Sequence, residues 1–160
     1  MSFAEDDAHL TLESIAQSAR RASLYDALRE HPGIGLLAAL DSLGVHVQSR
    51  AGRARIVDGA VEVLDGANPL EPYGADPLTV RAVEALVRQP NAGDIVLFGA
   101  YDGYEIVSFD DQIGAHGSAG GDQVWPFLIA PDALGVGNER IDNARDIHRV
   151  IMTRYSRSKD

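Results

Sequence analysis

Residues 34–65, IGLLAALDSLGVHVQSRAGRARIVDGAVEVLD, decide the fold that we expect for this chain. The run IGLLAAL is apolar throughout, and apolar residues alternate with polar ones in the short stretches that follow it. Alternation with a period of two residues is typical of half-buried strands, whereas a short continuous apolar run fits a buried strand. The joints contain glycine, and Asp58-Gly59 is among the stronger short hairpin signals. We therefore predict an antiparallel meander of three or four strands, of which the first is buried.

Helical spacing of apolar residues predicts helices near 11–30, 77–89 and 143–155. In the first of them a break is expected near Ser23, which forms a possible capping box with Asp26. Asp76 is the expected cap of the second helix because Pro77 suits the first helical position, and Asp142 or Asn143 is the expected cap of the third. Three more short strands are predicted, in DIVLFGA, YEIVSF and WPFLIA.

These elements predict an α/β (mixed α+β) fold, with a mixed sheet that contains the antiparallel meander and is flanked by about three helices. A length of 160 residues suits one domain. We expect a flexible acidic leader over 1–10, a single domain over 11–155 and a polar tail over 156–160.

Composition narrows the function classes. The net charge of −10 opposes nonspecific attraction to nucleic acid or to anionic lipid. The absence of cysteine excludes disulfides, iron–sulfur clusters and thiolate metal sites. The first residues lack a secretion signal, and no apolar run approaches the length of a membrane span. We expect a soluble, cytoplasmic chain with no membrane span and no nucleic-acid partner.

The stretch IGAHGSAGGDQVWPF, residues 113–127, places His116 among small residues. Glycine permits close backbone approach, so such a loop can wrap a ligand or a metal, although a tight surface turn with an incidental histidine also fits. The loop has neither the Walker lysine nor the dinucleotide spacing of a phosphate loop. Ser118 lies two residues from His116, but the nucleophile elbow Gly-x-Ser-x-Gly is missing, which argues against a catalytic triad.

The other candidate groups are weaker. Asp110-Asp111 follows a predicted strand, where alternation points the two carboxylates in opposite directions, and a solvated strand end explains this pair and Asp6-Asp7. The five histidines are scattered, at positions 9, 31, 46, 116 and 148. His46 alternates with two valines and is expected on the exposed face of a strand. Only His116 has surroundings that admit a metal, and a hydrolytic zinc site needs three protein ligands or more.

Four motifs occur in one order between Leu10 and Ile151: DALREHPGIGLL, NPLEPYG, NAGDIVLFGAYDG and FDDQIGAHGSAGGDQVWPFLIAP. This series resembles the C-terminal portion of bacterial alkaline-phosphatase-superfamily proteins. The resemblance is to their type I phosphodiesterase/nucleotide pyrophosphatase-like members, which are also labelled as phage holin family. In these proteins a His-Pro-Gly-Ile-Gly strand start, a Pro-rich turn, a Gly-Asp strand and a Gly-Ser-His-Gly-Gly loop follow one another.

The resemblance implies that His116 is the late ligand of a two-metal centre for phosphoryl transfer, in a loop formed with Gly114, Gly117, Ser118, Gly120 and Gly121. Paired metals clamp the attacking and leaving oxygens of an in-line displacement. Zinc or another divalent metal pair is therefore implied if a catalytic half completes the site. The chain departs from the family in lacking the upstream nucleophile and the Asp-His-Gly motif, and in carrying Ala115 where the family loop has serine. We predict no catalytic residue, no cofactor and no activity in the isolated chain.

Three explanations stay open. The chain is the C-terminal part of a longer metal-dependent phosphodiesterase (a hydrolase), or it works with a separate catalytic half, or it is a noncatalytic protein-interaction or assembly module that descends from the family. Each implies a surface that a partner covers, and Trp125, Phe127 and the first helix are the candidates for it. The expected partner is a catalytic half or a second copy of the chain. If the chain self-associates, a homodimer is expected, because closed twofold symmetry is the commonest form of oligomer.

Overall fold

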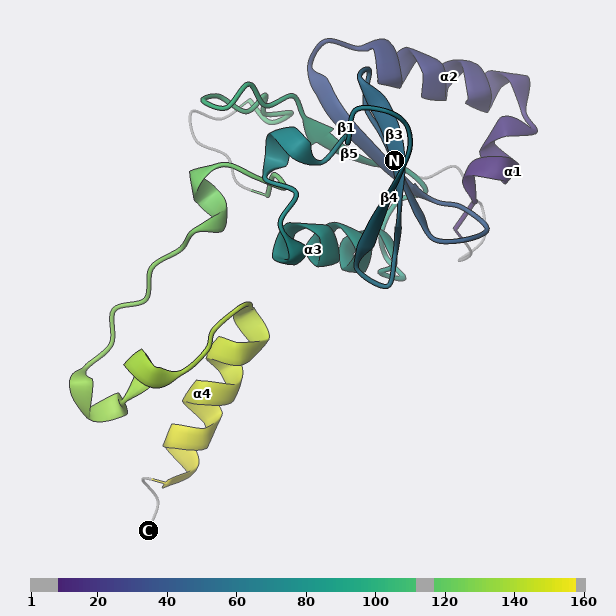
Figure 1. Ribbon diagram of the computed structural model, residues 1–160. Coiled ribbons are helices and arrows are strands. Elements are labelled where there is room, and N and C mark those ends of the chain that lie inside the picture. Colours follow the sequence, from purple (N-terminus) through teal and green to yellow (C-terminus); the bar gives the residue numbers. More distant parts are fainter. Residues whose placement is uncertain (1–8, 112–116, 158–160) are drawn as a thin grey trace. The chain divides into compact units, whose positions relative to one another are not determined.

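The computed structural model describes residues 9–111 and 117–157. The chain divides into two compact units, Met1–Val124 and Trp125–Asp160. The mixed α+β class is confirmed, since the first unit combines helices with a five-stranded sheet (Figure 1). None of the described helices is long and apolar enough to cross a membrane.

Two helices open the described chain, α1 (Leu12–Ala16) and α2 (Ala19–Glu30). The break between them lies at Ser18, and the prediction of a break near Ser23 is wrong. Ser18 has extended backbone angles, and its side chain accepts a hydrogen bond from the Arg21 N–H, so it caps α2 as N-cap serines do. Ser23 lies within α2, where the helical hydrogen bonds continue past it.

The sheet is built from the predicted meander and one later strand. Its strands are β1 (Ile34–Leu40), β2 (Val45–Gln48), β3 (Gly52–Val57), β4 (Ala60–Gly66) and β5 (Val96–Gly99), in the spatial order β4-β3-β2-β1-β5. All pairings of these strands are antiparallel, so the sheet is not the mixed one that we expected. Short hairpins reverse the chain from β1 to β4, and β5 returns beside β1 in the opposite direction. At the β3–β4 turn Asp58 and Gly59 both adopt positive φ, 50° and 76°, as a tight two-residue hairpin requires.

Helices cover both faces of this sheet (Figure 1). The predicted helix α3 (Pro77–Val87) buries one valine face, and Asp76 caps it as predicted. The core on the α3 side includes the buried residues Leu36, Val45, Val47, Ile56, Leu70, Tyr73, Val80, Val83, Val87 and Phe98. A smaller core on the side of α1 and α2 consists of Ile15, Tyr25, Ile34, Leu37 and Ile95.

His46 lies on the sheet face opposite α3 and is buried, with only 5% of its surface exposed. The prediction that it is exposed is therefore wrong. The reason is that β2 lies between β1 and β3, and its face opposite the valines also carries Gln48, which Tyr25 of α2 contacts. The Tyr25 hydroxyl of α2 donates a hydrogen bond to Gln48 Oε1 (3.1 Å), and His46 Nε2 lies 3.3 Å from the same oxygen. Polar side chains thus satisfy one another under the helix.

Two predicted strands do not form. Of YEIVSF, only Ile106 makes an isolated bridge, to Tyr101. The stretch WPFLIA, residues 125–130, lies in no strand or helix. Neither stretch finds a neighbouring strand that pairs along its length in the part of the chain that the structure describes, and a strand without pairing is not stable.

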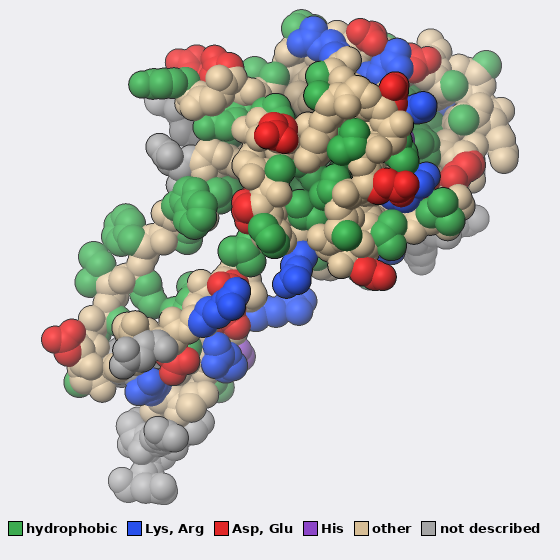
Figure 2. All heavy atoms as spheres, in the orientation of Figure 1, with side chains coloured by type: hydrophobic (Ala, Val, Ile, Leu, Met, Phe, Trp, Pro, Cys, Tyr) green, Lys and Arg blue, Asp and Glu red, His purple; other side chains and the backbone are tan. Residues whose placement is uncertain are grey.

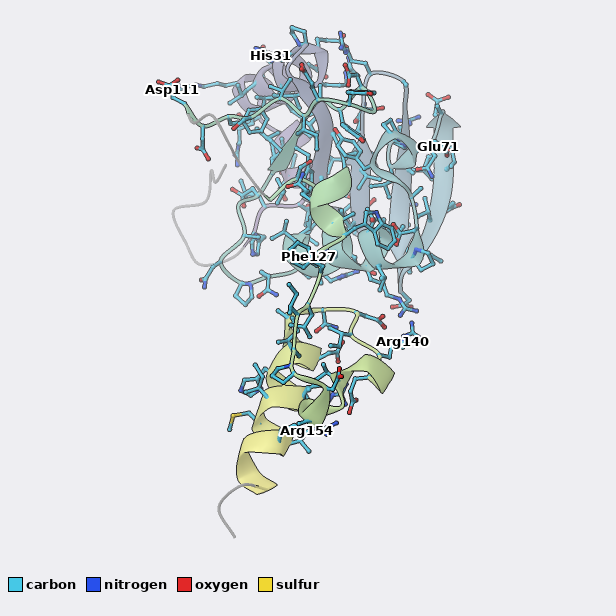
Figure 3. All side chains as sticks on the ribbon, turned by 90° about the vertical axis from the view of Figure 1, so that its left-hand side faces the viewer. His31, Glu71, Asp111, Phe127, Arg140 and Arg154 are labelled. Carbon is cyan, nitrogen blue, oxygen red and sulfur yellow. The ribbon has the colours of Figure 1, made fainter. Side chains whose placement is uncertain are left out.

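The second unit contains the predicted C-terminal helix, α4 (Ala144–Arg157), preceded by the short 3-10 helices η3 (Asp132–Leu134) and η4 (Val136–Asn138). The Asn143 side chain accepts hydrogen bonds from the N–H groups of Arg145 and Asp146 at the start of α4. Glu139 pairs with Arg149 and Arg154 of α4, at 3.7 and 3.2 Å. These contacts hold the segment before α4 against the helix (Arg154 is labelled in Figure 3).

Candidate functional site

The Pro-rich turn after β4 begins the candidate site. The Asn68 side chain accepts a hydrogen bond from the Leu70 N–H (3.1 Å), and the chain then turns through the 3-10 helix η1 (Glu71–Tyr73). Gly74 follows with a φ of 106°, a left-handed conformation that glycine adopts without strain. The turn buries the side chain of Tyr73 in the core on the α3 side.

Tyr73 contacts three other segments of the first unit. Its hydroxyl donates a 2.6 Å hydrogen bond to the carbonyl of Gly99 at the end of β5. A Cβ added to Gly35 in β1 would overlap this hydroxyl, so the glycine makes room for it. The Tyr73 ring also lies 6.2 Å from that of Tyr101, centre to centre. Burial raises the pKa of Tyr73 to about 12, which keeps the phenol protonated and able to donate.

The glycine loop packs on the same tyrosine. Gly120 is buried, and a Cβ added to it would lie 2.6 Å from the Tyr73 carbonyl oxygen and 2.7 Å from the Tyr73 Cα. Real side chains do not approach backbone so closely, so glycine is required here for the loop to sit where it does. The next residue, Gly121, has a φ of 79° and lies beside Ile106 and the Tyr101 ring.

Gln123 closes the loop. It belongs to the 3-10 helix η2 (Asp122–Val124). Its Oε1 accepts a hydrogen bond from the Gly117 N–H (3.1 Å), and its Nε2 donates to the Gly120 carbonyl (2.9 Å). One side chain thereby ties together both ends of the segment 117–120, next to the point where His116 precedes Gly117.

Ser118 lies inside this tied segment. Its hydroxyl oxygen is shielded from solvent and has no hydrogen-bond partner among the described residues. Most buried polar side-chain atoms are hydrogen-bonded, so an unpaired hydroxyl is a notable exception. A serine hydroxyl carries one donor and two lone pairs, and these are available to a group outside the described residues.

The predicted site residues divide between described and undescribed parts of the chain. Gly117, Ser118, Gly120 and Gly121 form the anchored half of the loop, whereas Gly114 and the predicted metal ligand His116 lie outside the described residues. Within the described ranges, no group of three histidine, aspartate or glutamate side chains is placed to hold a metal ion. The described residues therefore do not supply a metal site by themselves.

The other sequence candidates have ordinary surroundings. Asp110 and Asp111 are exposed after the segment that follows β5 (Asp111 is labelled in Figure 3), and Asp6-Asp7 lies outside the described residues. The His31 Nδ1 accepts a hydrogen bond from the Gly33 N–H, and His9 Nε2 lies 3.0 Å from the Gln89 carbonyl oxygen. His148 is exposed on α4.

Sequence reasoning did not predict the role of Tyr73 as the point where the motifs meet. The available signal was the Pro-Tyr-Gly order of the turn, which favours a fixed turn but does not say what the tyrosine contacts. Trp125 and Phe127, the predicted interface residues, are largely exposed at the start of the second unit. Comparison with protein-family models, with curated proteins and with solved structures finds no match to this chain.

Proposed function

We propose that this chain is the C-terminal part of an alkaline-phosphatase-superfamily, metal-dependent phosphodiesterase- or phosphatase-like protein. In this proposal its glycine loop presents His116 to a divalent-metal site whose nucleophile and remaining ligands belong to a catalytic half. In this proposal the isolated chain is inactive, because its sequence supplies one loop histidine but no Asp-His-Gly motif. We assign no catalytic step to its own residues.

The observation that supports this proposal is the convergence of the resemblance motifs on Tyr73. The first motif supplies Gly35, the Pro-rich turn supplies the tyrosine, the Gly-Asp strand supplies Gly99, and the glycine loop supplies Gly120. These four residues are spread over 86 positions of the sequence and meet within contact distance. Motifs that pack together into one local structure support the resemblance to one family more strongly than four motifs in separate turns would.

The anchoring of the loop also suits a metal ligand. A ligand-bearing loop must be held to within about 0.5 Å of its working geometry. The contacts of Gly120 with Tyr73 and the two hydrogen bonds of Gln123 supply such support on the C-terminal side of His116. The Ser118 hydroxyl, which has no hydrogen-bond partner among the described residues, is a further polar group within the same loop.

A noncatalytic protein-interaction or assembly module is the second candidate function. The exposed apolar stretch that contains Trp125 and Phe127 favours it, because large exposed apolar side chains gathered in one place mark contact sites. The expected partner is the catalytic half or a second copy of the chain.

Calorimetric titration with zinc and hydrolysis of a nitrophenyl phosphodiester test the proposed function, on wild type, on His116→Ala and on a control, His148→Ala. We expect no turnover by the isolated chain of any variant. Affinity purification should recover a partner that carries an Asp-His-Gly motif, and the mixture should hydrolyse the phosphodiester. His116→Ala should abolish that rate without loss of the complex, while His148→Ala should leave it unchanged.

Turnover by the isolated chain that depends on His116 would show that the chain holds a complete centre and would contradict the proposal. A reconstituted rate that His116→Ala does not alter would contradict the assignment of the loop. Recovery of copies of this chain alone, with no phosphodiesterase partner, would favour the assembly module.

A further inference from the structure

The stretch from Trp125 to Ala130 has the composition of a strand but no sheet. Trp125, Phe127 and Ile129 alternate along it and are 73%, 86% and 85% exposed. Its backbone makes no hydrogen bond in the part of the chain that the structure describes. Figure 2 shows hydrophobic side chains exposed along this stretch, and Figure 3 labels Phe127 on it. Unpaired backbone combined with exposed apolar side chains is a template for strand pairing.

A matching edge lies in the first unit. After β5 the chain folds back, so that Val107 donates a hydrogen bond to the Ala100 carbonyl (2.9 Å) and Glu105 accepts one from the Asp102 N–H (3.3 Å). Peptide groups of a strand alternate in direction, so Ile106 and Ser108 direct their N–H and C=O groups outward. Within the described residues these outward backbone groups have no partner. We call residues 106–109 the open edge.

The side chains around the open edge are apolar and exposed. Tyr104 is 96% exposed at the turn, and Val107 and Phe109 are 43% and 58% exposed. An apolar strand added beside the open edge would cover these side chains. The acidic pair Asp110-Asp111 begins only after the edge has ended.

The opposite end of the sheet is protected against such pairing. The strand β4 exposes the carboxylates of Glu62 and Asp65, and its register with β3 shifts between Arg53 and Ala54. Charges and bulges are the devices by which proteins protect edge strands. The open edge has neither along 106–109, so it is the better acceptor for an added strand.

We propose that two copies of this chain exchange strands, with Trp125–Ala130 of each copy pairing beside the open edge of the other. A second copy suits this stretch because residues 123–131 carry no charged side chain, which matters in a chain whose net charge is −10. The exchange is reciprocal, so the dimer closes with twofold symmetry, and in each copy both the stretch Trp125–Ala130 and the open edge are covered. The proposal rests on exposure and backbone pairing and does not depend on the phosphodiesterase assignment.

The area involved suits a stable dimer. Covered aromatic residues such as Trp125 and Phe127 bury about 150–250 Å² each, and the exchange covers both surfaces in both copies, so the total reaches the about 1,200–2,000 Å² of a standard interface. Main-chain hydrogen bonds add affinity, as in other cases where an extended segment joins a sheet edge.

Light scattering with sedimentation equilibrium tests the proposal over a range of concentrations. Wild type should be a dimer. Phe127→Asp should weaken the dimer at least about tenfold, because it places a charge in the apolar contact. Ser108→Pro should weaken it as well, because proline removes an outward N–H and fills the space of the incoming strand, yet leaves the Val107–Ala100 hydrogen bond in place.

Two matched controls test where on the chain the dimer contact lies. Val63→Asp puts the same charge on β4, the protected edge, and Ile151→Asp puts it on an exposed part of α4; both should leave the dimer intact. Circular dichroism checks that each variant is folded. A dimer that Val63→Asp dissociates but Ser108→Pro does not would overturn the choice of edge.

A cross-linking experiment separates exchange from pairing within one chain. The natural sequence has no cysteine, so the single variants F109C and F127C each carry one thiol. On oxidation, an equal mixture of the two should form a disulfide-linked heterodimer, and neither variant alone should form a linked dimer at a comparable rate. Wild type that is monomeric at all concentrations would overturn the proposal. So would a double variant, F109C/F127C, that forms an intrachain disulfide without linked dimers.

Discussion

The Tyr73 side chain contacts three other segments of the first unit, and its hydroxyl is the part that can be tested alone. Tyr73→Phe removes the buried hydrogen bond to the Gly99 carbonyl. We expect the free energy of unfolding to fall by about 0.5–1.5 kcal/mol, the usual net contribution of one hydrogen bond. Urea denaturation measures the change. The control Tyr101→Phe removes a similar bond, to the Gly103 carbonyl, at an exposed site and should change stability by less than about 0.5 kcal/mol.

His46 makes stability depend on pH. Burial lowers the pKa of His46 below its ordinary value of 6.5, and the nearby arginines 53 and 55 act in the same direction, while Gln48 and Asp41 oppose them. Below pH 6.5 the unfolded chain therefore binds a proton that the folded chain resists, so stability falls as the pH drops through 6.5 toward the lower folded pKa. Above pH 6.5 the contribution of His46 is constant.

The measurement is the urea midpoint of wild type and His46→Gln between pH 5 and pH 8. The wild-type midpoint should decline below pH 6.5 more steeply than that of His46→Gln. Glu13 affects stability in a different pH range. Hydrogen bonds from Ser42 lower its pKa from 4.5 to about 2, so its contribution to the free energy of unfolding is lost as the pH falls from 4.5 to about 2. Equal slopes for the two proteins between pH 5 and 6.5 would contradict the role of His46.

At the scale of elements, α3 depends on its cap. Asp76 Oδ1 accepts hydrogen bonds from the N–H groups of Leu78 (2.8 Å) and Thr79 (3.2 Å), and Oδ2 accepts one from the Thr79 hydroxyl (2.7 Å). Asp76→Ala should lower stability by about 0.5–2 kcal/mol, the usual effect of losing an N-cap. Asp76→Ser should retain most of it, because a serine oxygen can still accept from the helix N–H groups. Thermal unfolding of the three proteins at pH 7 distinguishes them, and equal effects of Ala and Ser would argue against capping.

The elements also show where local patterns stop being sufficient. The caps of α3 and α4 and the Asp58-Gly59 turn were predictable, because each involves residues only a few positions apart. The stretches YEIVSF and WPFLIA have the composition of strands, yet neither becomes a regular strand in the described structure. Composition makes a segment able to pair, but a strand also needs a neighbour with free backbone groups.

At the scale of the whole molecule, both apolar cores lie within Met1–Val124. We therefore expect a chain truncated after Val124 to fold cooperatively, with a free energy of unfolding within about 1 kcal/mol of that of the full chain when both are monomeric. Urea denaturation with circular dichroism makes the comparison. Because the truncation also removes Trp125–Ala130, the truncated chain should be monomeric at concentrations where the full chain is dimeric. A truncated chain that is unfolded would show that the second unit is needed for folding.

The sequence alone determined the α+β class, an antiparallel meander of three or four strands, the approximate bounds of α3 and α4, and the glycine-rich nature of the loop around residues 117–121. All of these follow from periodicity and from interactions between residues close in the sequence, and both can be read from the sequence directly. The tertiary structure decided that β5 pairs with β1, that His46 is buried under α2, and that Gly35, Gly99 and Gly120 meet at Tyr73. These outcomes depend on contacts between residues far apart in the chain, and which distant surfaces meet is determined by packing, which the local pattern does not encode.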